Sequence, residues 1–521
     1  MHVDIKIASG LVRGSVEADL AVFRGIPFAS LPVRFGAPQP VTGWRGVREA
    51  VSFGPPPPQS GAFGMDAAPA GAGDEWLTVN VWSPVPESSG AGGLPVMVWI
   101  QGGAYAFGMS GLPEYDGAVF ARGGVVLVTF NYRVGLEGFG YLPGTPANRG
   151  LLDQLAALEW VRDNIDGFGG DPDRVTVFGQ SAGGGSVAAL LAMPRAAGLF
   201  RRAIAQSVPG TFFTPELAAD ITRACAAEVG VEPADLPAVD PDLLPAAGDA
   251  VLAAMGAHAD RWGPVAHAGV PFAPVVDGDV LPTTPWRGLT GQVELVVGHT
   301  RDEQRLLTVI SGRLGTITPA QAAQTATVFG PDPARYLESF PDPAELFEVV
   351  RADWLFRMPS LHLAQAQLAA GGRAFLYELT WPAPGLGGIF GACHGLDVPL
   401  VFGNLTAGQP ATLIGDPTPE VQAVSAQMRA AWTAFASTGD PGWPGFETGA
   451  TRLFDVPPTV GDYPEQVSRE IWTDPPGVLD LVTFADSPEM HVPCRSEPAF
   501  PASRCRGWAG RGHCIDVSCA W

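Results

Sequence analysis

The sequence predicts an α/β protein with a mostly parallel central sheet that carries helices on both faces. Short runs rich in β-branched residues alternate with segments of helical periodicity, which is typical of strands joined by crossover helices. The runs are almost uniformly apolar, as expected for strands that are covered on both sides. Hydrophobic residues make up 46% of the chain and charged residues 16%, so a large core can form.

Five apolar runs are predicted to be buried strands, because each has the length of a strand and is rich in Val, Ile, Leu and Phe. In chain order they are Val96–Ile100, Val125–Phe130, Val175–Phe178, Val293–Val297 and Ala374–Leu379.

Two helices are predicted from periodicity and end signals. The first lies between the second and third strands, and its apolar face has a repeat of about 3.6 residues. That face consists of Leu151, Leu155, Leu158, Val161 and Ile165. Near the C-terminus, Thr418 can cap a second helix, Pro419 suits its first turn and Gly439 can end it.

We expect one domain over residues 1–473, although 521 residues could hold several. The proline-rich stretch 54–58 is interpreted as a connection inside that domain, since strand-like sequence resumes after it. Residues 474–521 lose all periodicity and hold four of the six cysteines. They are expected to form a C-terminal tail, and the cysteine spacings match no metal-binding pair.

The formal charge of −22 argues against nucleic-acid partners and anionic membrane surfaces, which it would repel. The first residues show no secretion signal, and no apolar run approaches the length of a membrane span. These observations predict a cytoplasmic enzyme that acts on a small molecule, as a monomer or homodimer.

Strand 175–178 runs directly into Gly179-Gln180-Ser181-Ala182-Gly183, and a helical stretch of small residues follows. When the motif G-x-S-x-G lies between a strand and a helix, its serine occupies a tight turn and serves as a nucleophile. Glycines two residues before and after Ser181 let the strand and the helix approach closely. The motif alone occurs often by chance, but its position between a strand and a helix favours the catalytic reading.

A second loop of small residues, Gln101-Gly102-Gly103-Ala104-Tyr105, follows the strand that ends at Ile100. A loop after an early strand supplies backbone N–H donors for a negatively charged reaction intermediate in such enzymes. A Gly-Gly-Ala loop by itself is usually only a turn, so its value lies in its pairing with Ser181.

Together with these motifs, a colinear series of segments resembles the type-B carboxylesterase/lipase family of α/β-hydrolases. This family includes cholinesterases, some fungal lipases and many bacterial esterases, among them those of the para-nitrobenzyl-esterase type. The resemblance covers about residues 8–473. Its segments are Val22-Phe23-Arg24-Gly25-Ile26-Pro27-Phe28-Ala29, Leu77-Thr78-Val79-Asn80-Val81-Trp82, Asn131-Tyr132-Arg133-Val134-Gly135, Phe168-Gly169-Gly170-Asp171-Pro172 and Trp432-Thr433-Ala434-Phe435-Ala436.

The resemblance implies a catalytic triad of Ser181, Glu303 and His394. Glu303 ends the segment Gly298-His299-Thr300-Arg301-Asp302-Glu303, and His394 is the second residue of the segment Cys393-His394-Gly395-Leu396-Asp397-Val398-Pro399-Leu400-Val401-Phe402-Gly403. Asp302 is the nearest rival for the acid. The resemblance also implies that the N–H groups of Gly103, Ala104 and Ala182 form the oxyanion hole, and that neither a metal nor an organic cofactor is needed.

Six aromatic residues near matched motifs are candidates for an apolar substrate pocket: Tyr105, Phe107, Phe212, Phe213, Trp354 and Phe390. Gln180 joins them because it adjoins the nucleophile. It stands where the family usually has glutamate, and Gln101 stands where many bacterial members have histidine.

The implied reaction is hydrolysis of small to medium carboxylic esters through a covalent acyl-serine. A lipase or polyester hydrolase for long-chain or polymeric esters is the main alternative, and an amidase or thioesterase is a weaker one. A non-catalytic adhesion protein of the neuroligin type also shares the fold, but such proteins lack a working triad.

Overall fold

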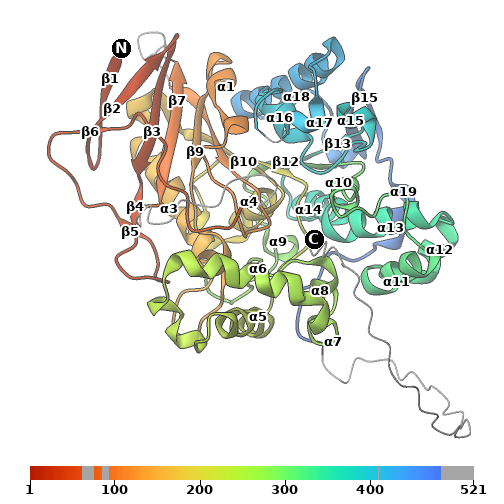
Figure 1. Cartoon of the computed structure of the whole chain (residues 1–521). Helices are drawn as coiled ribbons and strands as arrows, with labels where there is room; N and C mark the ends of the chain where they lie inside the picture. The colour runs from red at the N-terminus through yellow and green to blue at the C-terminus, as the bar shows by residue number, and fades with distance from the viewer. Residues whose placement is uncertain (62–74, 85–92, 409, 483–521) are drawn as a thin grey trace, which may run out of the picture.

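The computed structural model describes residues 1–61, 75–84, 93–408 and 410–482, which form one large sheet flanked by helices (Figure 1). The strands of the sheet are β1 (His2–Ile7), β2 (Gly10–Glu17), β3 (Leu20–Pro27), β6 (Val47–Glu49), β7 (Thr78–Pro84), β8 (Leu94–Ile100), β9 (Val126–Phe130), β10 (Gly170–Gln180), β11 (Arg202–Gln206), β12 (Glu294–Thr300), β13 (Ala374–Leu379), β14 (Ala450–Phe454) and β15 (Thr459–Asp462). Their order is β1-β2-β3-β7-β9-β8-β10-β11-β12-β13-β14-β15, with β6 beside β2.

The centre of the sheet is parallel, which confirms the predicted fold class. Every neighbouring pair from β9 through β8, β10, β11, β12 and β13 to β14 runs parallel. The N-terminal strands β1, β2, β3 and β7 pair antiparallel, as does the last strand, β15. All five predicted strands are present among the central strands, although β9 and β12 each begin one residue later than predicted.

Successive side chains of the central strands enter two separate hydrophobic cores, because a strand presents alternate residues to opposite faces. Val96, Val98 and Ile100 of β8 belong to one core, and Met97 and Trp99 to the other. The first core includes residues of α3 (Arg149–Asn164), α4 (Ala182–Ala192) and α14 (Met358–Ala369). The second includes residues of α1 (Ala118–Arg122), α16 (Asp397–Phe402) and α18 (Pro419–Thr438).

Both predicted helices are confirmed. Helix α3 spans Arg149–Asn164. Helix α18 begins after Thr418, whose side chain accepts a hydrogen bond from the N–H of Val421. It has Pro419 in its first turn, and it ends at Gly439, which has a left-handed φ of 79° that glycine adopts without strain.

Two groups of helices follow the carboxyl ends of β11 and β12, and in Figure 1 the first lies at the bottom and the second at the right edge. The first group is α5 (Pro215–Glu228), α6 (Leu244–Ala254), α7 (Ala259–Trp262) and α8 (Pro264–Ala268). The second is α11 (Pro319–Phe329), α12 (Pro333–Ser339) and α13 (Pro343–Ala352).

The described part of the expected C-terminal tail, residues 474–482, packs on the first of these groups. The N–H of Leu479 donates to the carbonyl of Phe212 (2.7 Å), and the N–H of Thr214 donates to the carbonyl of Leu479 (2.9 Å). The hydroxyl of Thr214 also donates to Asp480 (2.7 Å). Leu479 is partly buried against the first core, so this segment adds a strand-like contact beside helix α5.

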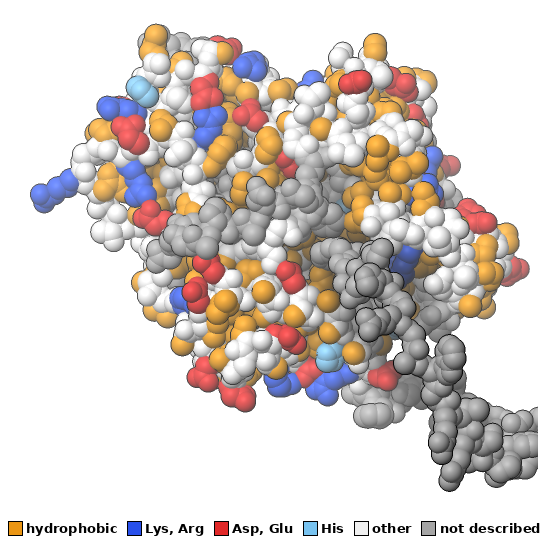
Figure 2. All heavy atoms as spheres, viewed as in Figure 1, with side chains coloured by type: hydrophobic (Ala, Val, Ile, Leu, Met, Phe, Trp, Pro, Cys, Tyr) orange, Lys and Arg blue, Asp and Glu red, His pale blue; other side chains and the backbone are white. Residues whose placement is uncertain are grey.

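On the face shown in Figure 2, basic and acidic side chains are interspersed. The N-terminal strands carry two such pairs, Arg13 with Asp4 (2.7 Å) and Arg24 with Glu17 (2.5 Å). Among the described residues, no helix combines the length and the apolar character that crossing a bilayer requires.

Candidate active site

Ser181 occupies a sharp turn between strand β10 and helix α4. Its φ of 59° and ψ of −125° lie in a region that side-chain-bearing residues rarely adopt, and holding a residue there costs about 1–3 kcal/mol. The Ser181 N–H donates to the carbonyl of Gln206 at the end of β11 (3.0 Å). The turn therefore fixes the serine at the carboxyl ends of two adjacent strands.

The glycines on either side of Ser181 are required by close backbone packing. A Cβ atom on Gly179 would lie 2.6 Å from the carbonyl carbon of Gly183, and one on Gly183 would lie 2.0 Å from the carbonyl oxygen of Ile100. Neither gap can hold a methyl group, so only glycine at both positions lets β10, α4 and the end of β8 meet.

The loop after β8 folds against Ser181. The carbonyl of Gly103 accepts hydrogen bonds from the N–H groups of Ala106 (2.8 Å) and Phe107 (3.1 Å), and Gly103 and Ala104 have φ values of 121° and 50°. A Cβ atom on Gly102 would lie 3.2 Å from the Cβ of Ser181. The small residues of the loop therefore bring its backbone beside the serine.

Ala182 is the first residue of helix α4. N–H groups in the first turn of a helix have no acceptor within the helix, and the helix dipole adds a partial positive charge there. The Ala182 N–H is therefore available for an oxygen that develops negative charge next to Ser181.

Glu303 follows strand β12 and is fully buried. Its Oε1 accepts hydrogen bonds from the hydroxyl of Ser207 (2.6 Å) and the N–H of Thr300 (2.9 Å). Its Oε2 lies 2.5 Å from Nδ1 of His394. Burial raises the pKa of Glu303, but the charge of His394 and the hydrogen bonds from His394 and Ser207 outweigh it, so the pKa is lowered from its ordinary value.

Asp302, the rival acid, has a different position. Its Oδ2 accepts a hydrogen bond from the N–H of Ala392 (2.8 Å), and its own N–H donates to the carbonyl of Ala392 (2.9 Å). Asp302 thereby holds the loop that carries His394, while Glu303 contacts the imidazole itself.

The other imidazole nitrogen, Nε2 of His394, lies 3.1 Å from the side-chain nitrogen of Gln180. Because Nδ1 faces a carboxylate, it carries the proton and Nε2 is an acceptor, so the Gln180 amide donates to it. The ring of Phe356 stacks on the imidazole, with a centroid distance of 4.2 Å and an interplanar angle of 22°. His394 is therefore held by a carboxylate, an amide and an aromatic ring.

Ser207 and Phe356 are site residues that the sequence did not reveal. Ser207 follows the short strand β11 and has a φ of 51°. Phe356 belongs to a π-helical turn at residues 353–357, between α13 and α14. Neither belongs to a recognisable local motif, and only the approach of distant segments brings them to Glu303 and His394.

A second buried carboxyl group, Asp397, lies close to this site at the start of α16. Its Oδ2 accepts a hydrogen bond from the side-chain amide of Gln206 (2.7 Å), and its Oδ1 has no partner among the described residues. Burial raises the pKa of Asp397 to about 6, and the nearby charge of Glu303 adds to the effect.

The candidate pocket aromatics occupy different environments. The Phe107 ring packs against Gly103 (3.1 Å from a Cβ placed there), and half-buried Trp354 packs on Phe329 (4.8 Å between centroids). The four others belong to the buried cores: Tyr105, Phe212 and Phe213 to the first and Phe390 to the second. Gln180 is the member of the predicted pocket set that contacts His394.

Ser181, Glu303 and His394 follow β10, β12 and β13 in the chain order that is typical of an α/β-hydrolase. The chain belongs to the carboxylesterase family, because the model of that family matches residues 2–327 and 339–458. The resemblance stated from the sequence is thus confirmed.

Two relatives match this chain over most of its length and most of their own. The chain is 35% identical over 495 residues to para-nitrobenzyl esterase of Bacillus subtilis, covering 90% of this chain and 98% of that protein. It is 33% identical over 468 residues to fumonisin B1 esterase of Sphingopyxis macrogoltabida, covering 84% of each.

Solved structures of esterases have the same fold as this chain. A para-nitrobenzyl esterase structure superposes with a TM-score of 0.80 at 33% identity, covering 90% of this chain and 99% of that one. A carboxylesterase of Geobacillus stearothermophilus gives 0.78 at 34% identity, with the same coverage. The chain is a serine carboxylester hydrolase.

Proposed function

We propose that Ser181, His394 and Glu303 carry out this hydrolysis through an acyl-serine intermediate. The observation that carries the proposal is the 2.5 Å contact between Glu303 and Nδ1 of His394, beside a serine on a strained turn. A carboxylate at Nδ1 orients the imidazole and stabilises its cation, which leaves Nε2 to accept a proton.

In the first half-reaction, the Ser181 hydroxyl gives its proton to Nε2 of His394 while its Oγ attacks the ester carbonyl carbon. The bond to the alcohol oxygen then breaks, and His394 returns the proton to the departing alcohol. Water hydrolyses the acyl-serine by the same proton transfers and releases the acid. The Gln180 amide must release Nε2 for the serine to donate to it.

The N–H groups of Gly103, Ala104 and Ala182 would stabilise the oxyanion of each tetrahedral intermediate. The glycine-rich backbone beside Ser181 and the position of the Ala182 N–H in the first turn of α4 support this assignment. Loss of one such donor typically costs on the order of 100- to 1,000-fold in rate.

The direct test replaces the two residues that exchange the proton. We expect Ser181→Ala and His394→Ala each to lower kcat on p-nitrophenyl acetate by about 10⁴-fold or more, because triad members act as a unit. Circular dichroism and the thermal midpoint serve as controls for folding. A folded Ser181→Ala enzyme with wild-type turnover would refute the proposal, and a phosphonate probe should label Ser181 in the wild type.

For the substrate range, we propose small and medium acyl chains. The names of the relatives support this, since para-nitrobenzyl and fumonisin esters are not long-chain glycerides. In a p-nitrophenyl ester series, kcat/KM should be higher for C4 than for C16. A preference for C16 that rises above the micellar threshold would instead indicate a lipase.

We further propose that the enzyme acts in the cytoplasm as a monomer or homodimer. Cys225 and Cys393 are both free and buried, which suits a reducing compartment. Light scattering after size exclusion tests the oligomeric state, and fractionation of the native host tests the location.

A further inference from the structure

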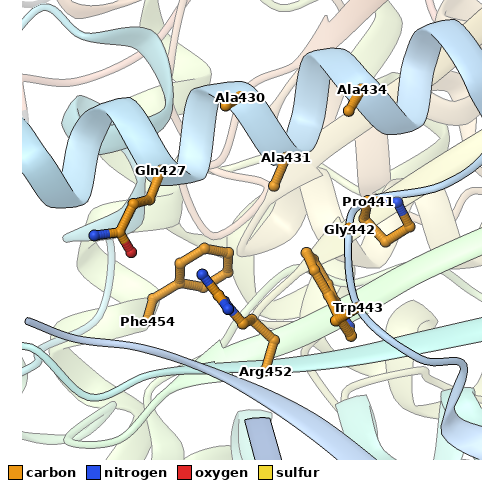
Figure 3. A pocket seen from close by; sticks show the side chains of 9 residues that line it. All are labelled: Gln427, Ala430, Ala431, Ala434, Pro441, Gly442, Trp443, Arg452 and Phe454. Carbon is orange, nitrogen blue, oxygen red and sulfur yellow. The ribbon is translucent and has the colours of Figure 1, made fainter. Parts of the chain in front are cut away.

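A hollow lies between helix α18 and strand β14 and has a volume of about 320 Å³. Its lining includes Gln427, Ala430, Ala434, Trp443, Arg452 and Phe454. Figure 3 shows small side chains of α18 along one wall, with Gln427 at one end and Trp443 at the other. We call it the Trp443 hollow. Residues of α18 belong to the second core, whereas Ser181 lies directly before helix α4, whose residues belong to the first, so the hollow is separate from the catalytic turn.

Arg452 brings an unbalanced positive charge to this hollow. Its guanidinium lies over the ring of Phe454, 5.3 Å from the centroid, and within the described part of the chain it makes no ion pair. Burial lowers the pKa of Arg452, and no neighbouring carboxylate opposes that effect.

Three buried polar atoms of the hollow have no hydrogen-bond partner among the described residues. They are Nε1 of Trp443, Nε of Arg452 and Oε1 of Gln427. Trp443 is only 6% exposed, and its ring is held edge-on against Phe454 (5.8 Å, 88°) and Phe375 (6.3 Å, 83°). Buried polar groups are normally paired, and here three unpaired ones meet at one hollow.

We propose that the Trp443 hollow binds a small monocarboxylate with a flat apolar body, such as an aromatic acid. The carboxylate pairs with the Arg452 guanidinium, whose planar fork matches its two oxygens. The indole N–H of Trp443 offers a further donor, and the Gln427 amide can present either its oxygen or its NH₂ group.

The remaining lining favours an apolar body. Alanine and proline side chains and two aromatic rings make up most of the wall, and the volume is at the lower end of the range of ligand pockets, roughly 300–1,000 Å³. A phosphate dianion would leave one charge unbalanced between these apolar walls, because the hollow contains one arginine and no other cation in its lining.

This ligand class is the same as the acid that ester hydrolysis releases. The binding site does not depend on the proposed triad, however, since none of its residues belongs to it. Failure of the triad assignment and failure of this site are therefore distinguishable.

The test measures benzoate binding by isothermal titration calorimetry in wild type, Arg452→Gln, Trp443→Phe and Arg469→Gln. Arg469 is an exposed arginine and serves as a matched control for charge. Binding of benzoate at the catalytic pocket would be common to all four proteins. We expect Arg452→Gln to weaken the additional site about tenfold or more and Trp443→Phe a few-fold, as for loss of a charged and a neutral hydrogen bond. Arg469→Gln should match wild type.

Benzamide, which has the same ring and no charge, should bind the additional site at least about tenfold more weakly than benzoate. Thermal midpoints and hydrolysis of p-nitrophenyl acetate confirm folding. If Arg452→Gln does not fold, Arg452→Lys replaces it and should still weaken benzoate several-fold, because lysine lacks the planar fork. Equal binding of benzamide and benzoate, no additional site, or an unchanged Kd in the Arg452 variant would each overturn the proposal.

Discussion

Gln180 gives His394 a neutral partner at the nitrogen that takes the serine proton in the proposed mechanism. The amide donates to Nε2 at 3.1 Å, so in the resting enzyme it occupies the lone pair that catalysis uses. A glutamate in the same place would bring a negative charge against the imidazole, and at an effective dielectric constant near 20 such a contact is worth about 4 kcal/mol before screening.

We therefore expect Gln180→Glu to move the acidic limb of the kcat/KM profile to higher pH by about one unit or more. It should also raise the preference for choline esters over neutral esters, because a carboxylate attracts a cationic alcohol group. The measurement is a pH–rate profile on p-nitrophenyl butyrate and on butyrylcholine, with Gln180→Ala as the uncharged control. An unchanged acidic limb together with unchanged relative choline-ester activity would show that residue 180 does not govern the charge at the base.

Ser181 could be chosen from its own motif, but Glu303 and His394 could be chosen only through the family resemblance, and the structure brings these two into contact. The sequence could not indicate which neighbours hold them. Ser207 reaches Glu303 from the end of a five-residue strand, and Phe356 reaches His394 from a π-helical turn. Both depend on long-range packing, which leaves no local pattern to read.

Helix α16 begins at Asp397, a carboxyl group that is buried where its charge is poorly compensated. Its pKa is raised from 3.8 to about 6, mainly by burial. Because the pKa of Asp397 is higher in the folded than in the unfolded protein, its ionisation is less favourable in the folded state. The fold therefore carries no such penalty below about pH 4, and the free energy of unfolding falls as the pH rises through about 6. At pH 7–8 the ionised side chain therefore destabilises the fold by up to roughly 3 kcal/mol.

Asp397→Asn should consequently raise the free energy of unfolding by about 1–3 kcal/mol at pH 8 and change it little at pH 4. The asparagine oxygen can still accept from Gln206. Urea unfolding at pH 4, 6 and 8 measures the effect, and Asp19→Asn on the exposed surface is the control. An equal stability gain at all three pH values, or none at pH 8, would contradict the assigned titration.

Among the helices and strands, the central strands were predicted well from the sequence, because buried parallel strands are continuous apolar runs. It did not indicate β11, whose sequence Arg-Ala-Ile-Ala-Gln is short and weakly β-branched. The antiparallel strands β1 and β2 were also missed, since polar residues facing solvent interrupt their apolar pattern.

For the whole molecule, we propose that the catalytic unit extends to residue 482 rather than ending at 473. Residues 479–480 make two backbone hydrogen bonds and a side-chain hydrogen bond with the segment before α5. All matched motifs and the family match end before this point.

Truncation after residue 482 should leave kcat/KM within about twofold of wild type, because termini outside the packed unit tolerate removal. Truncation after residue 473 should lower the free energy of unfolding by roughly 2–4 kcal/mol, through loss of the hydrogen bonds and of the partly buried Leu479 side chain. Thermal unfolding and p-nitrophenyl butyrate assays compare the two. The expectation fails if the shorter protein is as stable as the longer one, or if the longer one loses activity.

The strand order places β8, β10, β11, β12 and β13 side by side, and each contributes a site segment from its carboxyl end. Neighbouring strands are about 4.8 Å apart. The number of strands between them therefore fixes the distance between Ser181 and Glu303. The long helical segments after β11 and β12 connect these strands to the next ones without changing the spacing of the sheet. Insertions or deletions in those helical segments can therefore change the substrate specificity while the distances between Ser181, Glu303 and His394 stay the same. These segments are the natural place to alter specificity by engineering.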